Sequence, residues 1–260
     1  MENQMCFASA MTTEQDVARA ADHLVSQIEA QLAGRIPDLV LMFLSPHYRL
    51  EVAGLVARLQ SRLKPPVLLG CTAEGVIGRE QEIEREPAIT LVAAHLPGVE
   101  LNPFALQSMD WRRTLSEAAE LRGMVNAPPE TKLFLLLADP YTTPMDAVLE
   151  AFNLYYPAMP IIGGMASGSQ RAGGNALIYN DQVLNNGAVG LTLAGAFEAD
   201  IIVSQAAGRW VNPLPSPAPA RTLFLVWPGS RRSVRFKPWF KPCPRLIGCC
   251  CKMVSLLAGP

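Results

Sequence analysis

Two glycine-rich segments are the parts of this sequence best suited to hold a ligand. Residues 70–75 read Gly-Cys-Thr-Ala-Glu-Gly, and residues 163–168 read Gly-Gly-Met-Ala-Ser-Gly. If both segments form turns, their small residues leave backbone N–H groups free to bind an anion or a carboxylate. The alternative is that the glycines only permit close packing beneath a sheet. Neither segment fits the dinucleotide-binding or the Walker glycine pattern, so nucleotide binding has little support.

Cys71, within the first of these segments, raises the alternative of an enzyme. A nucleophilic thiol needs a base, which is usually a histidine, and the sequence contains His23, His47 and His95. His47 stands at the end of a predicted strand, where it would lie near Cys71 if the two strands are neighbours. The other interpretation of Cys71 is a small buried cysteine without reactivity.

Asp139 follows an apolar run, at the place where the first half of the sequence carries Ser45. A carboxylate there either holds a ligand amine or hydroxyl, or caps its own loop through backbone N–H groups. The histidines and cysteines show no metal-ligand spacing, and we expect no metal and no cofactor. The residues predicted to bind the ligand are Gly70, Cys71, Thr72, Gly75, Asp139, Gly163, Gly164 and Ser167.

Each glycine-rich segment ends a strand–helix–strand unit, which indicates an internal duplication. The first unit has strands at 39–44 and 67–69 around a helix at 49–63, and the second has strands at 133–138 and 161–162 around a helix at 145–156. From Pro46 to Gly70 is 24 positions, and from Pro140 to Gly163 is 23. We predict copies at about residues 36–104 and 130–205.

The uninterrupted apolar runs in these units are typical of strands that are buried on both faces. Leu50 is expected on the inner side of the first helix, and a hairpin is predicted with arms at 176–179 and 182–184. The predicted fold class is mixed α/β (α+β). The duplicated units would form mixed sheets flanked by helices, in a domain over residues 12–205.

Residues 206–260 differ in composition from the rest of the chain. Residues 1–205 carry 13 Lys/Arg and 23 Asp/Glu, a net charge of −10, whereas the tail carries nine basic and no acidic residues. The tail also holds nine of the 22 prolines and four of the six cysteines, and it has no helical or strand period. It is interpreted as a basic arm for nucleic acid or anionic lipid, as an acylated or metal-binding cysteine cluster, or as the product of a frameshift.

The genetic code favours the frameshift. The frame that joins the last base of each codon to the first two bases of the next permits Gly-Cys-Arg-Pro directly after Gln205. It also permits Leu-Leu-Gln where the visible sequence has adjacent cysteines at 249–251. The amino-acid sequence in this shifted frame resembles an ordinary helix-forming segment, and the sequence in the given frame does not. We therefore predict that residues 206–260 are disordered or are a frameshift product.

From about residue 20 to residue 205 the chain resembles the N-terminal domain of the FIST family, a sensory module named for F-box and intracellular signal transduction proteins. The resemblance rests on residues 68–75, 88–98, 160–164 and 186–189. It implies a domain that binds a small ligand, an amino acid or a related metabolite, and passes a signal onward without known catalytic residues. The partners it implies are the ligand, the family's C-terminal FIST domain, which this sequence lacks, and signalling or ubiquitin-ligase-type proteins.

Three functions compete at this point. The first is a non-enzymatic sensory domain with its ligand near the two glycine-rich segments. The second is an enzyme that uses Cys71, and the third is an interaction scaffold without a ligand. No run reaches the ~18 uninterrupted apolar residues of a membrane span, and the N-terminus lacks a signal-peptide pattern. We therefore expect a cytoplasmic protein without membrane or nucleic-acid partners.

Overall fold

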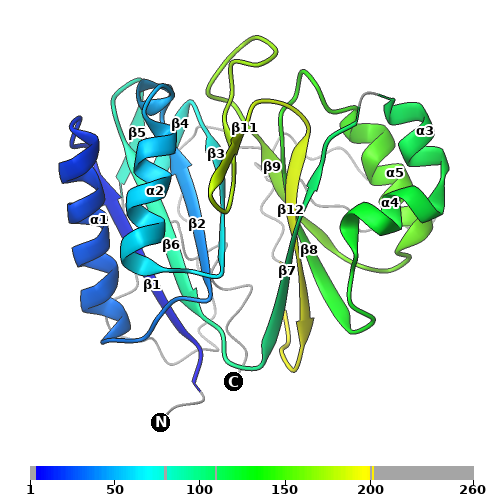
Figure 1. Ribbon diagram of the computed structural model, residues 1–260, viewed down its shortest axis with the longest axis horizontal. Helices are drawn as coiled ribbons and strands as arrows, with labels where there is room; N and C mark the ends of the chain where they lie inside the picture. Colours follow the sequence, from blue (N-terminus) through cyan, green and yellow to red (C-terminus); the bar gives the residue numbers. More distant parts are fainter. Residues whose placement is uncertain (1–3, 79–80, 109, 200, 202–260) are drawn as a thin grey trace, which may run out of the picture.

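The computed structural model describes residues 4–78, 81–108, 110–199 and 201, and these residues form four layers (Figure 1). Two helices cover a six-stranded sheet, that sheet packs on a four-stranded sheet, and further helices cover the second sheet. The predicted mixed α/β fold is confirmed. The predictions for residues 206–260 lie outside the described residues.

The strands of the two sheets follow a mixed order in the sequence. The first sheet runs β1 (Cys6–Thr12), β6 (Ile89–His95), β2 (Leu39–Leu44), β3 (Val67–Thr72), β10 (Leu177–Tyr179) and β11 (Gln182–Leu184). The second runs β7 (Val99–Leu106), β12 (Ala188–Gly195), β8 (Thr131–Ala138) and β9 (Ile161–Met165). A separate hairpin consists of β4 (Gly75–Gly78) and β5 (Gln81–Glu84).

Helices cover the outer face of each sheet. They are α1 (Val17–Leu32), the short 3-10 helix η1 (Pro46–Tyr48), α2 (Val52–Leu63), α3 (Trp111–Ser116), α4 (Ala118–Val125) and α5 (Met145–Tyr155). Among the described residues, no helix combines the length and the apolar character that crossing a bilayer requires. Helix α2 begins at Val52, three residues later than the predicted start at residue 49. Leu50, which was expected to face inward, precedes the helix and is 92% exposed.

An apolar core lies between the two sheets. Leu41 and Leu69 contribute to it from the first sheet, and Leu135 and Leu191 contribute from the second. Because side chains alternate along a strand, neighbouring residues such as Met42 pack against the helices instead. The strands are therefore buried on both faces, as their uninterrupted apolar runs predict.

The two sheets share an arrangement of four strands. In each, one strand lies between an antiparallel neighbour and a parallel neighbour: β2 between β6 and β3, and β8 between β12 and β9. The fourth strand, β1 or β7, pairs antiparallel with β6 or β12. This likeness accords with an internal duplication, although the duplication itself stays a prediction. Strand β1 was not expected, because it precedes the predicted start of the domain at residue 12.

The hairpin β10–β11 belongs by sequence to the second half but completes the first sheet. Strand β10 pairs antiparallel with β3. At the turn of this hairpin, Asn180 accepts a hydrogen bond from the Leu68 N–H at 3.1 Å and donates its own N–H to the Leu68 carbonyl at 2.7 Å. The hairpin arms were predicted correctly, and their partner strand was not predicted at all.

The glycine-rich segments are not the turns that the sequence suggested. Strand β3 continues through Thr72, and β9 includes Gly163 and Gly164. A Cβ at Gly70 would overlap the carbonyl oxygen of Met42 on β2, and a Cβ at Gly163 would overlap that of Leu136 on β8. Gly163 also has a φ of +149°, which other residues rarely adopt. These two glycines therefore serve close packing between parallel strands, which was the alternative interpretation.

A side chain at Gly70 is expected to destabilise the fold. Gly70→Ala should lower the free energy of unfolding by about 1–3 kcal/mol, because Met42 belongs to a central strand that cannot shift freely. Gly54 in α2 has open space around a built Cβ, and Gly54→Ala should instead raise stability by about 0.5–1 kcal/mol. Urea unfolding measures both, and equal stability of the two variants would contradict this account.

Candidate functional site

The carboxyl ends of β3, β8 and β9 meet at one end of the molecule (Figure 1). The segment that follows β9 crosses from the second sheet to β10 in the first. Along this crossing, Ser167 donates its N–H to the Thr72 carbonyl at 3.2 Å, and its Oγ accepts the Glu74 N–H at 3.1 Å. The two glycine-rich segments thus contact each other directly, and no open cleft separates them at this point.

Asp139 is fully buried where β8 ends. Its Oδ2 accepts the Tyr141 N–H at 3.2 Å and the Thr142 hydroxyl at 2.7 Å. Its Oδ1 accepts the Asn175 side-chain amide at 2.9 Å. Both oxygens therefore accept hydrogen bonds from neighbouring parts of the chain, and the carboxylate caps its own loop.

Asn175 joins the two halves of this end, and the sequence reasoning missed it. The side chain is fully buried. Its Nδ2 donates to Asp139 after β8, and its Oδ1 accepts the Thr72 hydroxyl of β3 at 3.1 Å. The same hydroxyl accepts the Ala176 N–H at 3.0 Å. The only local signal in the sequence is a short polar side chain after two glycines, which is common in loops.

Arg49 holds the crossing segment from the side of the first sheet. Its Nε donates to the Gly174 carbonyl at 2.7 Å, and its Nη2 donates to the Gly173 carbonyl at 2.6 Å. Gly173 has a φ of +70°, so the glycine permits the turn that presents these carbonyls. Asn175 is thus held by its own side chain and by the preceding backbone.

Cys71 lies in the core between the sheets and is 4% exposed. Burial raises the pKa of its thiol from the ordinary 9.0 to about 12. His47 is exposed, and its Nδ1 lies 3.1 Å from the Ser45 hydroxyl; no hydrogen bond to Cys71 is present in the described part of the chain. His23 is exposed on α1, and the Nδ1 of His95 lies 3.1 Å from Asp38 Oδ2. A protonated, base-free thiol is a poor nucleophile.

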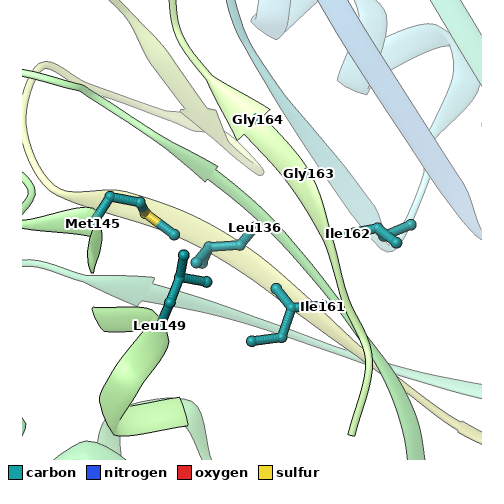
Figure 2. A pocket seen from close by; sticks show the side chains of 7 residues that line it. All are labelled: Leu136, Met145, Leu149, Ile161, Ile162, Gly163 and Gly164. Carbon is teal, nitrogen blue, oxygen red and sulfur yellow. The ribbon is translucent and has the colours of Figure 1, made fainter. Parts of the chain in front are cut away.

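A small apolar hollow lies beside β9 (Figure 2). It is lined by Leu136, Met145, Leu149, Ile161, Ile162, Gly163 and Gly164. Its free volume is ≈ 10 Å³, which is close to the room that a single water molecule needs. The hollow as it stands therefore accepts no more than a methyl-sized group. Two of its lining residues, Gly163 and Gly164, were predicted from the sequence to contact a ligand.

The predicted ligand residues divide by exposure. Five are buried, and these are Gly70, Cys71, Thr72, Asp139 and Gly163. Gly75 and Gly164 are half-buried, and Ser167 is exposed. The structure brings Thr72, Asp139 and Ser167 to one end, whereas Gly75 lies in the separate β4–β5 hairpin. Among the described residues there is no group of three or more side chains able to hold a metal ion.

Comparison with known proteins identifies relatives for most of the described chain. A family model described as the FIST N domain matches residues 38–207. An uncharacterized protein of Mycobacterium tuberculosis is 32% identical over 192 residues, which cover 74% of this chain and 49% of that protein. An uncharacterized protein of Mycobacterium bovis is 33% identical over 183 residues, which cover 70% and 46%. The chain thus spans about half the length of the curated relatives it matches.

A solved structure gives only a weak likeness. The crystal structure of a cyanuric acid hydrolase from A. caulinodans aligns over 75% of this chain and 73% of that one. The TM-score is 0.36 and the sequence identity is 9%, which is too low to support an argument about fold or function.

Removing the Asn175 amide should destabilise the protein. Asn175→Ala removes the donor to the buried Asp139 Oδ1 and the acceptor of the Thr72 hydroxyl hydrogen, so the free energy of unfolding should fall by about 1–3 kcal/mol. Asn175→Asp replaces the donor to Asp139 with a second carboxylate, so it should be at least as destabilising as Asn175→Ala. Asn186→Ala, at an exposed site, should change stability by less than about 0.5 kcal/mol. Three equal urea midpoints would remove the structural role assigned to Asn175.

The buried Cys71 thiol should make stability depend on alkaline pH. Its folded-state pKa of about 12 lies above the ordinary 9.0, so its contribution is complete below pH 9.0 and is lost as pH rises toward 12. Cys71→Ala should therefore flatten the fall in unfolding free energy just above pH 9.0. Alkylation followed by peptide mass mapping provides an independent check. Rapid labelling of Cys71 in the folded protein at neutral pH would refute the assignment.

Proposed function

The chain belongs to the FIST N domain family, a family of signal-transduction sensory domains, and on this premise we propose that it is a non-enzymatic sensor that binds a small ligand beside β9. The ligand we propose is an amino acid or a related metabolite. The observation that carries this placement is that Gly163 and Gly164 line the hollow of Figure 2.

The chemistry of the hollow supports a small ligand with both polar and apolar groups. Met145 and Leu149 offer an apolar wall, and the bare backbone of the two glycines lies beside it. Backbone N–H and C=O groups bind carboxylate and ammonium groups respectively. Because the free volume is ≈ 10 Å³, we propose that only a methyl-sized part of the ligand enters, while its polar groups stay along the strand.

The buried polar groups behind this strand would hold the site in place rather than touch the ligand. Ala166, which follows β9, donates its N–H to the Ala138 carbonyl at 2.8 Å. Asp139 and Asn175 then fix the loops on either side. We therefore assign contact with the ligand to Gly163, Gly164 and the exposed Ser167, and a positioning role to Asp139 and Thr72.

The geometry weighs against the enzyme hypothesis. Cys71 is buried, its thiol pKa is raised, and its predicted base His47 bonds elsewhere. We propose that the signal passes to segments or proteins outside the length matched here; the chain spans about half of the relatives it matches. The family's C-terminal domain and signalling proteins are the recipients that we propose for this signal.

A thermal-shift screen of amino acids and small metabolites tests the proposal. A ligand at a hundredfold excess over its Kd should raise the free energy of unfolding by ~2.7 kcal/mol. Leu149→Phe should weaken or abolish that shift, because a larger side chain at a lining position fills the hollow, whereas Gly54→Ala on α2 should keep it. If no compound stabilises the unmodified protein, or if Leu149→Phe responds fully, the proposed site is wrong.

A further inference from the structure

A thiol, an imidazole and a carboxylate lie on three neighbouring strands of the first sheet. Cys6 opens β1, His95 closes β6, and Asp38 directly precedes β2. The strands are adjacent in the order β1, β6, β2. Because β2 runs parallel to β3, its start lies at the far end of the sheet from Thr72, where β3 stops (Figure 1). This group therefore shares no residue with the proposed ligand site.

The register of the sheet places Cys6 beside His95. The two residues are direct partners in the antiparallel pair β1–β6, and direct partners have Cβ atoms about 4.5–5.5 Å apart on the same face. Cys6 packs against the core cluster beneath α1 and α2, to which Ala8 and Ala93 also belong. By alternation along β6, His95 faces the same side as Ala93. The thiol and the imidazole therefore share one face of the sheet, and rotation of the Cys6 side chain can bring them together.

Asp38 and the loop before it determine which nitrogen of His95 carries the proton. Nδ1 of His95 lies 3.1 Å from Asp38 Oδ2 and 3.1 Å from the Ile36 carbonyl oxygen. Both partners are acceptors, so Nδ1 is the donor. In the neutral ring the lone pair is then on Nε2, and no hydrogen bond between described residues reaches that atom. Asp38 is itself held in place, because its Oδ2 accepts the Leu96 N–H at 2.6 Å.

These side chains supply the three parts that an assisted thiol requires. A nucleophilic cysteine needs a nearby base, and the base needs a third group that orients it. His95 is placed to act as the base for Cys6, and Asp38 is placed to orient His95. The thiol and Nε2 are not hydrogen-bonded to each other among the described residues. Such pairs are often long in the free protein and tighten when a reactant binds.

Solvent reaches this group, in contrast to Cys71. The side chains of His95 and Asp38 are 23% and 36% exposed, and Cys6 is half-buried. Cys71 lies in the core between the sheets and has no base. Of the two cysteines in the described part of the chain, Cys6 is therefore the one that a small reagent can approach.

We propose that Cys6 is a site of reversible modification by low-molecular-weight disulfides, which gives the domain a thiol-redox input. His95 Nε2 accepts the proton of the thiol, and the Cys6 sulfur attacks one sulfur of the disulfide. A new S–S bond forms, the S–S bond of the reagent breaks, and the departing thiolate takes the proton from His95. The products are a mixed disulfide on Cys6 and one small free thiol. The reagent is thus the oxidant, and the reaction needs no other reactant.

This inference goes beyond the proposed function and does not depend on it. The reaction takes place in the first sheet, whereas Gly163 and Gly164 belong to β9 in the second. A small thiol reverses the modification by the same exchange. The domain would therefore respond to two separate inputs, a ligand and the thiol–disulfide balance of its surroundings.

The test compares Cys6 in the folded full chain with the same cysteine in a synthetic peptide of residues 1–12, which contains no histidine. Each is reacted with oxidised glutathione, and after tryptic digestion of the protein the fragment that carries Cys6 is followed by mass. The other cysteines lie in other fragments and do not enter the measured rate. At pH 7 Cys6 should react about threefold faster in the protein. A free thiol is only a few per cent ionised there, and a thiolate beside an imidazolium is more abundant but intrinsically less nucleophilic.

The pH profile distinguishes an assisted thiol from one that is merely exposed. The rate of the peptide should rise about tenfold from pH 6 to pH 7, because an unassisted thiol ionises in proportion to hydroxide in this range. The rate of Cys6 in the folded protein should rise less steeply, because an imidazolium beside the sulfur preserves part of the thiolate at the lower pH.

Protein variants identify the base. His95→Asn keeps an N–H donor near the place of Nδ1 but has no Nε2, so it should lose the rate advantage and regain the tenfold rise. Asp38→Asn keeps an acceptor for the Leu96 N–H but removes the charge, and its rate should fall between the two. His23→Asn, at an exposed position of α1, should change neither the rate nor the profile. Circular dichroism and urea midpoints confirm that each variant is folded.

The outcomes decide the proposal without reference to the ligand. A rate for Cys6 in the protein that is equal to or below that of the peptide overturns it, and so does an unchanged rate and profile in His95→Asn. Labelling of Cys71 as fast as that of Cys6 would also contradict it, because exposure and a base are then not what controls reactivity. The thermal-shift screen is carried out on the reduced protein, so its result and the result of the thiol assay stand or fall separately.

Discussion

Two sheets that pack on apolar inner faces leave no place for charged or amide side chains except the ends of the sandwich. Burying such a group without a partner costs about 1–3 kcal/mol, so those that are buried must bond to one another. Within the described residues, Asp139 and Asn175 are the buried side chains that carry a carboxylate or an amide, and they are hydrogen-bonded to each other at one such end. This constraint places the polar chemistry where β3, β8 and β9 stop.

The same constraint explains why the groups predicted to bind a ligand are mostly structural. Thr72 and Asp139 sit beneath the surface and tie one sheet to the other through Asn175. What remains accessible is backbone, at the half-buried Gly164 and the exposed Ser167. In the binding mode that we propose, recognition at this end would depend on strand geometry more than on side-chain identity, and the buried side chains would determine that geometry.

Local patterns predicted local structure well. The apolar run of Leu39–Leu44 predicted β2 to the residue, because a buried central strand needs every side chain to be apolar. Gly70 was predicted to form a turn because the reason for a glycine at this position is not local. The glycine makes room for the carbonyl of Met42, which lies on the neighbouring strand. Asn175 escaped notice for the same reason, since its partners Thr72 and Asp139 come from different sheets. Leu50 was misplaced because η1 shifts the start of α2.

The hairpin β10–β11 has a consequence for how the protein is made. Strand β3 ends at Thr72, but its outer neighbour begins at Leu177, so the two are synthesised more than a hundred residues apart. At ~5–20 residues per second, translation needs roughly 5–20 s to deliver the partner. During that interval the edge of an apolar strand is uncovered on the ribosome. The nascent chain is then most prone to aggregate, and we expect it to depend on chaperones until the hairpin emerges.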